Sequence, residues 1–148
     1  QRAIALESGE IDLCLDTAAS DAVLVDMDGD GEKELAVLSP FHGDNISIYK
    51  KKDGAFEKVY DYGKPAEFTH AIFGGMLCGR PAVVIGHRKA GRDLLMFTWN
   101  PDKADYEVCV LDEDCGPANV LKYSHDGKEI LISANRETDE VAMYTVAL

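Results

Sequence analysis

A short acidic run is the part of this 148-residue chain whose residue types and spacing could do chemistry. Carboxylates occupy every second position from Asp26 to Asp30, and Gly31 and two glutamates follow within four residues. Calcium takes six to eight oxygen ligands at about 2.3–2.6 Å, so a tight turn can fold alternating carboxylates around one ion. The predicted calcium ligands are Asp26, Asp28, Asp30, Glu32 (through its main-chain carbonyl) and Glu34.

This run has two other interpretations. The helix–loop–helix calcium motif shares its first half, but the motif's twelfth ligand position falls on Val37, and both flanks alternate like strands. An acidic hairpin turn that holds no ion is the alternative to a calcium site. A single calcium ion in such a loop is expected to be structural rather than catalytic.

The elements around the run repeat at a fixed spacing. Gly31, Gly79 and Gly127 lie 48 residues apart (79 − 31 and 127 − 79), and apolar runs flank each of them. A period of about 20–50 residues is typical of stacked structural units. At the positions that match the three aspartates, the second and third units offer too few hard oxygens for calcium: Gly74, Met76 and Cys78 in one, Lys122, Ser124 and Asp126 in the other. One ion per chain is therefore expected.

Each period contains short runs rich in Val, Ile, Leu and Tyr, separated by Gly, Asp, Asn and Pro. This pattern predicts successive antiparallel strands and an all-β fold. Units of four such strands are typical of β-propeller blades. Asp30-Gly31 and Asp53-Gly54 are predicted to form tight hairpin turns. The predicted units are 1–17 (strands three and four only), 18–65, 66–113 and 114–148 (lacking its fourth strand), all within one propeller segment.

Three four-stranded units are fewer than the four to eight blades of typical propellers. Two explanations remain open at the level of sequence. The chain is a segment of a longer propeller, or two chains form a six-bladed homodimer in which each N-terminal strand completes the partner's last blade.

The run from Ala22 to Pro40, AVLVDMDGDGEKELAVLSP, resembles the FG-GAP repeat of integrin-type propellers and the related VCBS repeat. In that family an acidic loop between the first two strands of a blade holds calcium, and Leu38-Ser39-Pro40 stands where a Gly-Ala-Pro-like triplet follows the second strand. Glu34 replaces the family's usual aspartate. The resemblance implies a secreted protein, extracellular or in the cell envelope, with a cytoplasmic location as the alternative.

A second set of residues collects on the face that the blade topology places opposite the calcium loop. His70, His87, Arg88 and Arg92 are the candidate ligand-binding residues there. Arginine offers planar donors to an anion, and two imidazoles can bind a metal or exchange protons with a sugar. Solvated loop side chains are the alternative interpretation. The resemblance allows a sugar lyase or dehydratase at this face, but no nucleophile and base can be selected from the sequence, so the catalytic residues are unknown.

The composition of the chain disfavours some classes of binding partner. The chain has 15 basic and 27 acidic residues and a formal net charge of −12, which disfavours nucleic acid because binding to its phosphates depends on Lys and Arg. No apolar stretch approaches the roughly 20 residues of a transmembrane helix. We therefore expect a calcium-stabilised, non-catalytic propeller segment that binds a protein or carbohydrate ligand.

Overall fold

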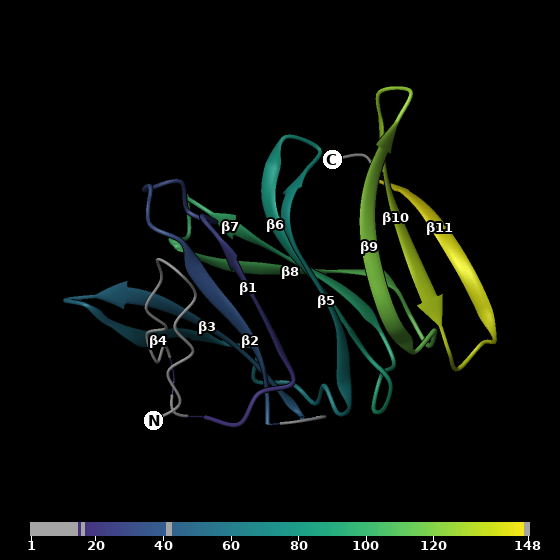
Figure 1. The fold of residues 1–148 in the computed structure, drawn as a ribbon, viewed down its shortest axis with the longest axis horizontal. Coiled ribbons are helices and arrows are strands. Elements are labelled where there is room, and N and C mark those ends of the chain that lie inside the picture. The colour runs from purple at the N-terminus through teal and green to yellow at the C-terminus, as the bar shows by residue number, and fades with distance from the viewer. Residues whose placement is uncertain (1–14, 16, 41–42, 147–148) are drawn as a thin grey trace, which may run out of the picture.

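All regular elements of the computed structural model are β-strands, within residues 15, 17–40 and 43–146, which the structure describes (Figure 1). They form three antiparallel sheets of four, four and three strands, each strand hydrogen-bonded to its neighbour in sequence. The first sheet contains β1 (Asp21–Val25), β2 (Glu34–Ser39), β3 (Asn45–Lys52) and β4 (Ala55–Asp61). The second contains β5 (Thr69–Leu77), β6 (Arg80–His87), β7 (Leu94–Asn100) and β8 (Asp105–Asp112). The third contains β9 (Pro117–His125), β10 (Lys128–Asn135) and β11 (Glu140–Val146).

The predicted all-β class is confirmed: residues 18–65 and 66–113 contain four strands each, and three strands lie within 114–146. β2 is buried along its whole length and β6 along most of its length, because both have strands on each side and apolar neighbours on both faces. The outermost strand β4 is mostly exposed, and only Phe56 and Tyr60 on it are half-buried, as expected for a strand with one face in solvent. The two strands predicted before residue 18 lie outside the described residues.

One predicted turn is wrong. Asp53-Gly54 does form a tight turn with φ of 50° and 88°, but no tight turn at Asp30-Gly31 joins β1 to β2. These strands are connected by the eight residues 26–33, whereas two residues connect β5 to β6 and β9 to β10. The longer loop also shifts the pairing of β1 by two residues: Leu24 pairs with Leu35, while Gly74 and not Ile72 pairs with Val83.

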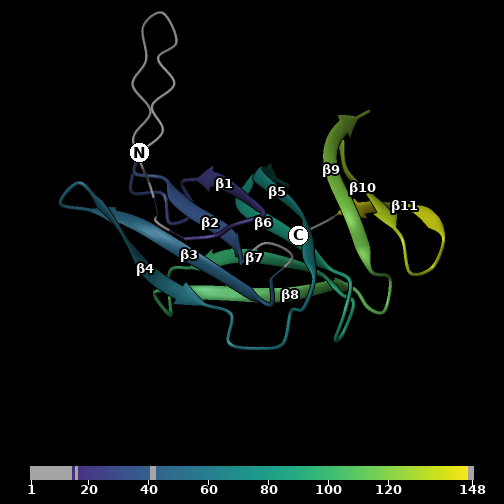
Figure 2. The same cartoon turned by 60° about the horizontal axis from the view of Figure 1, so that its bottom comes forward.

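The three sheets lie side by side in sequence order, with β1 next to β5 and β5 next to β9 (Figures 1 and 2). A hydrophobic core fills the space between the first and second sheets, and another fills the space between the second and third. Phe97 on β7 is fully buried in the first core, where its ring meets Tyr60 and Tyr62 edge-on with centroids 6.3 and 5.5 Å away. Packing between sheets therefore holds the chain together.

The same cross-strand row recurs on one face of every sheet. The rows are Val23–Ala36–Ile48 in the first sheet, Phe73–Val84–Met96 in the second and Leu121–Ile132–Met143 in the third. The first row packs in the core against the second sheet, and the second row packs in the core against the third. The third row has no following sheet among the described residues, and its ends are exposed, Leu121 by 49% and Met143 by 64%.

Polar contacts also join the second and third sheets. The carboxylate of Glu129 accepts hydrogen bonds from the main-chain nitrogen of Cys78 at 3.0 Å and from Ser124 Oγ at 2.6 Å, and it pairs with Lys122 at 2.7 Å. The lysine, the hydroxyl and the amide together lower the pKa of Glu129 to about 2. Glu129 thus links the β5–β6 turn to β9 and β10.

No helix in the described part of the chain is long and apolar enough to cross a membrane.

Candidate metal centre

The acidic loop folds around its own carboxylates. Asp26 accepts hydrogen bonds from the main-chain nitrogens of Gly29 (2.8 Å) and Gly31 (3.1 Å), both of which have positive φ angles that glycine adopts without strain. Asp28 accepts from the nitrogen of Asp30 at 3.2 Å, and Asp30 accepts from that of Glu32 at 2.9 Å. Each aspartate therefore organises the backbone that follows it, which explains why the loop is wide rather than a two-residue turn.

Glu34 is the buried member of the centre. It begins β2, its side chain is fully buried, and its Oε2 accepts a 2.6 Å hydrogen bond from the main-chain nitrogen of Met27. Its other oxygen, Oε1, is buried and accepts no hydrogen bond of good geometry, and the cation nearest to it is Lys50 Nζ, 3.0 Å away. A buried carboxylate is costly without a compensating positive charge, so this position in an acidic cluster favours a cation.

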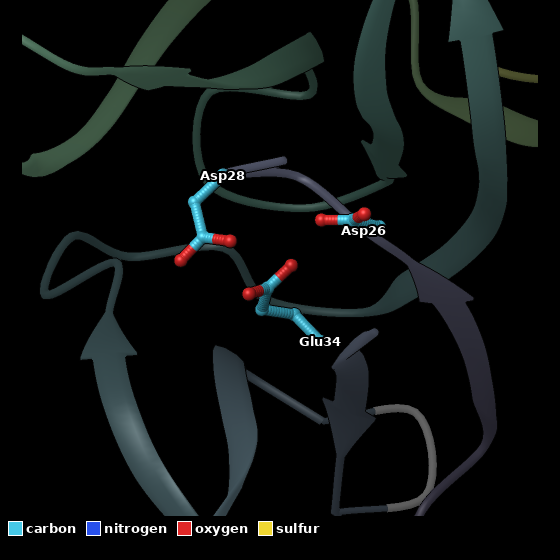
Figure 3. Close-up of side chains that lie close together, drawn as sticks. All are labelled: Asp26, Asp28 and Glu34. Atoms are coloured by element: carbon cyan, nitrogen blue, oxygen red, sulfur yellow. The ribbon is translucent and has the colours of Figure 1, made fainter. Parts of the chain in front are cut away.

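Three of the predicted ligands converge. Asp26, Asp28 and Glu34 can each supply a carboxylate oxygen such that the three atoms lie within 4.8 Å of one another (Figure 3). This spacing is compatible with three oxygens around one ion at calcium distances. Asp30 and Glu32 are not part of this group; the Asp30 side chain is half exposed.

A lysine enters the same cluster from β3. Lys50 Nζ lies 2.5 Å from Asp28 Oδ2, 2.6 Å from Asp30 Oδ2 and 3.0 Å from Glu34 Oε1, with only 16% of its side chain exposed. Pairing of Leu35 with Tyr49 places Lys50 beside the first residue of β2, which explains the contact with Glu34. The ammonium group thus lies among carboxylates that the sequence predicts as calcium ligands.

The electrostatics of the cluster follow from these contacts. Burial lowers the pKa of Lys50, but its hydrogen bonds and ion pairs with Asp28, Asp30 and Glu34 outweigh burial, so the net direction is a raised pKa. The Lys50 contact is also the main cause that lowers the pKa of Asp30. On β8, burial raises the pKa of Tyr106, and the negative charges of Glu34 and Asp28 raise it further. Lys50 therefore remains charged and neutralises only part of the cluster.

Lys50 was not among the residues predicted for this site, although the sequence carries a signal for it. Ile46 and Ile48 lie on the buried face of β3, and strand alternation places Lys50 on that same face. A lysine in line with buried isoleucines is expected to have a carboxylate partner. The nearby acidic run is the evident source of one.

The four residues predicted for the opposite face each have a partner within the protein. His87 is 1% exposed, and its Nδ1 lies 2.7 Å from the carbonyl oxygen of Lys89. His70 Nδ1 lies 3.0 Å from the carbonyl oxygen of Ala118, which connects β5 to β9. Two of the four, His70 and Arg88, meet at Phe68: the imidazole stacks on its ring, and the guanidinium lies 4.9 Å from the ring centroid.

The two arginines form ion pairs. Arg88 donates two hydrogen bonds to Glu137 Oε1, at 3.2 and 2.9 Å, and Arg92 pairs with Asp114. A nearby surface pocket, at the start of β11, is lined by other residues: Ala118, Ala134, Asn135, Arg136, Asp139, Glu140 and Val141. These contacts connect neighbouring loops and sheets and do not bring the four predicted residues into one pocket.

Neither a scan of protein-family models nor a search of curated proteins finds a match to this chain.

Proposed function

We propose that the three sheets are consecutive blades of a β-propeller of the FG-GAP or VCBS type, stabilised by calcium at the acidic loop. The recurrence of one apolar row from sheet to sheet supports the propeller, because each row is placed to receive the next blade. The observation that carries the calcium site is the convergence of Asp26, Asp28 and Glu34 on one point, where the buried Glu34 Oε1 has only the Lys50 ammonium as a counter-ion.

The role that fits this arrangement is a binding scaffold rather than an enzyme. Its ligand would be a protein or a carbohydrate. The resemblance to FG-GAP and VCBS repeats also implies that the protein is exported from the cell. An enzyme site on the opposite face would need His87, Arg88 and Arg92. Their side chains contact other residues of the protein, which supports a structural role for them.

Calcium is expected to raise the melting temperature of the chelator-treated protein. A ligand that binds only the native state stabilises it by about 2.7 kcal/mol at 100 times its Kd, which is about 5–10 °C for a domain of this size. Asp28→Ala should remove most of this gain, because it deletes one of the converging carboxylates. Differential scanning calorimetry with and without calcium measures the shift.

Asp102→Ala is the matched control, since Asp102 is an exposed aspartate in the β7–β8 loop. Each variant is compared with itself with and without calcium, which separates the loss of the ion from the loss of the Asp28–Lys50 ion pair. If calcium does not change the melting temperature of the wild type, the proposed calcium site is contradicted.

The exposed row of the third sheet supports an assembly of two chains into six blades. Leu121, Ile132 and Met143 match rows that are covered by the next sheet, and Leu24, on the other face of the first sheet, is 52% exposed. In a homodimer, the Leu24 face of one chain can cover the exposed row on the third sheet of the other chain. The two-fold arrangement then closes a ring of six blades. We expect twice the chain mass of 16.2 kDa in sedimentation velocity.

Met143→Glu should convert this dimer to a monomer, because it places a charge in an apolar interface. Val110→Glu on β8 changes another exposed apolar residue (45% exposed) away from both faces and should leave the dimer intact. If the protein stays monomeric as its concentration rises, the homodimer is contradicted. A longer chain with further blades is then the favoured explanation.

A further inference from the structure

We propose that Lys50 is a built-in cation that occupies the acidic loop in the metal-free protein and must leave before calcium can bind. This inference deepens the proposed function and rests on it, because it concerns the control of the same site. Lys50 would set the calcium affinity and keep the loop folded when calcium is scarce.

Lys50 occupies the position that a bound ion would take. The ammonium nitrogen lies within 3.0 Å of oxygens from Asp28, Asp30 and Glu34, and two of these residues belong to the group that converges for a metal. Calcium needs oxygens at about 2.3–2.6 Å, so an ion bound to Asp28 and Glu34 would lie within a few ångströms of this nitrogen. Repulsion between a divalent ion and an ammonium at that distance is strong, so both cannot occupy the cluster together.

Lys50 does not balance the charge of the cluster. Asp28, Asp30 and Glu34 contact its ammonium and Asp26 lies beside them, so four carboxylates and one ammonium leave an excess of three negative charges (four minus one). The ammonium lies 3.0 Å from Glu34 Oε1 without forming a hydrogen bond of good geometry. The lysine is therefore an incomplete substitute for a divalent ion, and calcium has a reason to replace it.

The Lys50 side chain is free to leave the cluster. Lys50 is attached through a flexible four-carbon stem, and Asp30, one of its partners, is half exposed. The ammonium can therefore move outward to solvent while β3 keeps its pairing. The fixed backbone contacts of Asp26 and Glu34 do not depend on the lysine, so the ligand geometry can persist after it leaves.

The test compares the calcium Kd of the wild type with that of Lys50→Met by isothermal titration calorimetry. Removing the competing charge should tighten binding at least about tenfold. Lys50→Arg keeps the charge and should stay close to the wild type. Lys52→Met makes the same change in net charge two residues along β3, at an exposed side chain, and should alter the Kd less than about twofold.

A second measurement follows the melting temperature in chelator. Lys50→Met should melt below the wild type because buried Glu34 loses its counter-ion, and calcium should restore it. Lys52→Met should show neither effect.

The outcomes separate the two proposals. If the wild type binds calcium and Lys50→Met binds it equally well, the lysine proposal is overturned and the calcium site stands. If only Lys50→Met binds calcium, the lysine proposal is supported in its strongest form, while calcium stabilisation of the native chain is rejected. If neither binds calcium, both are overturned.

Discussion

Glu34→Ala is expected to destabilise the fold by about 3 kcal/mol in the absence of calcium. Breaking a buried ion pair by removing one partner typically costs about 3–5 kcal/mol. The lower end applies here because Lys50 keeps its contacts with Asp28 and Asp30. The substitution also leaves the main-chain nitrogen of Met27 without its acceptor. Urea unfolding in chelator measures the loss.

Glu32→Ala is the matched control, because Glu32 lies in the same loop but its side chain is exposed, and it should change the free energy of unfolding by less than about 0.5 kcal/mol. Glu34→Gln keeps an oxygen that can accept from Met27 and should cost less than alanine. Equal stabilities for Glu34→Ala and the wild type would show that the buried carboxylate is not part of the loop's support.

Phe97→Ala is expected to cost about 4 kcal/mol, within the 3–5 kcal/mol typical of a large aromatic removed from a core. Phe97 is fully buried, and its ring contacts Tyr60 on β4 of the first sheet and Tyr62 just after that strand. The cavity would therefore open between two sheets, where it weakens the contact that joins them. Thermal unfolding should show a fall of about 8–16 °C.

Thr98→Ala provides the control, since Thr98 follows Phe97 on β7 and its side chain points to the other face of the sheet. Phe97→Leu should lose less stability than alanine because it fills part of the cavity. A loss below about 1 kcal/mol for Phe97→Ala would mean that the first two sheets can repack around the gap or separate easily.

Local patterns in the sequence were sufficient for the strands. Their alternation of apolar and polar residues depends on which face of a strand meets a core, so it predicted the all-β class and the four, four and three strands found from residue 18 onward. The 48-residue spacing also placed Gly79 and Gly127 in equivalent turns. The spacing was misleading at β1, where carboxylates that bind their own loop amides support a longer connection and move the pairing by two residues.

The carboxylate cluster of the candidate metal centre was only partly predictable from local spacing. Alternating carboxylates in a loop identify Asp26 and Asp28, and Glu34 was found because it follows closely in sequence. Lys50 was missed because 16 residues separate it from Glu34 in the chain (50 − 34), and only the antiparallel pairing of β2 with β3 brings the two together. Side-chain contacts across a sheet depend on register, which the acidic run does not encode.

The four residues predicted for the opposite face also show which features local sequence determines and which depend on tertiary packing. The sequence by itself determined that His70, His87, Arg88 and Arg92 lie at strand ends and in loops, because strand boundaries follow local patterns. Tertiary structure alone decided where their side chains point: His87 is buried, Arg88 reaches Glu137 after the β10 strand, and Arg92 pairs with Asp114. Partners 22 to 49 residues away (114 − 92 and 137 − 88) are chosen by how strands and sheets pack, and that packing is a property of the whole chain.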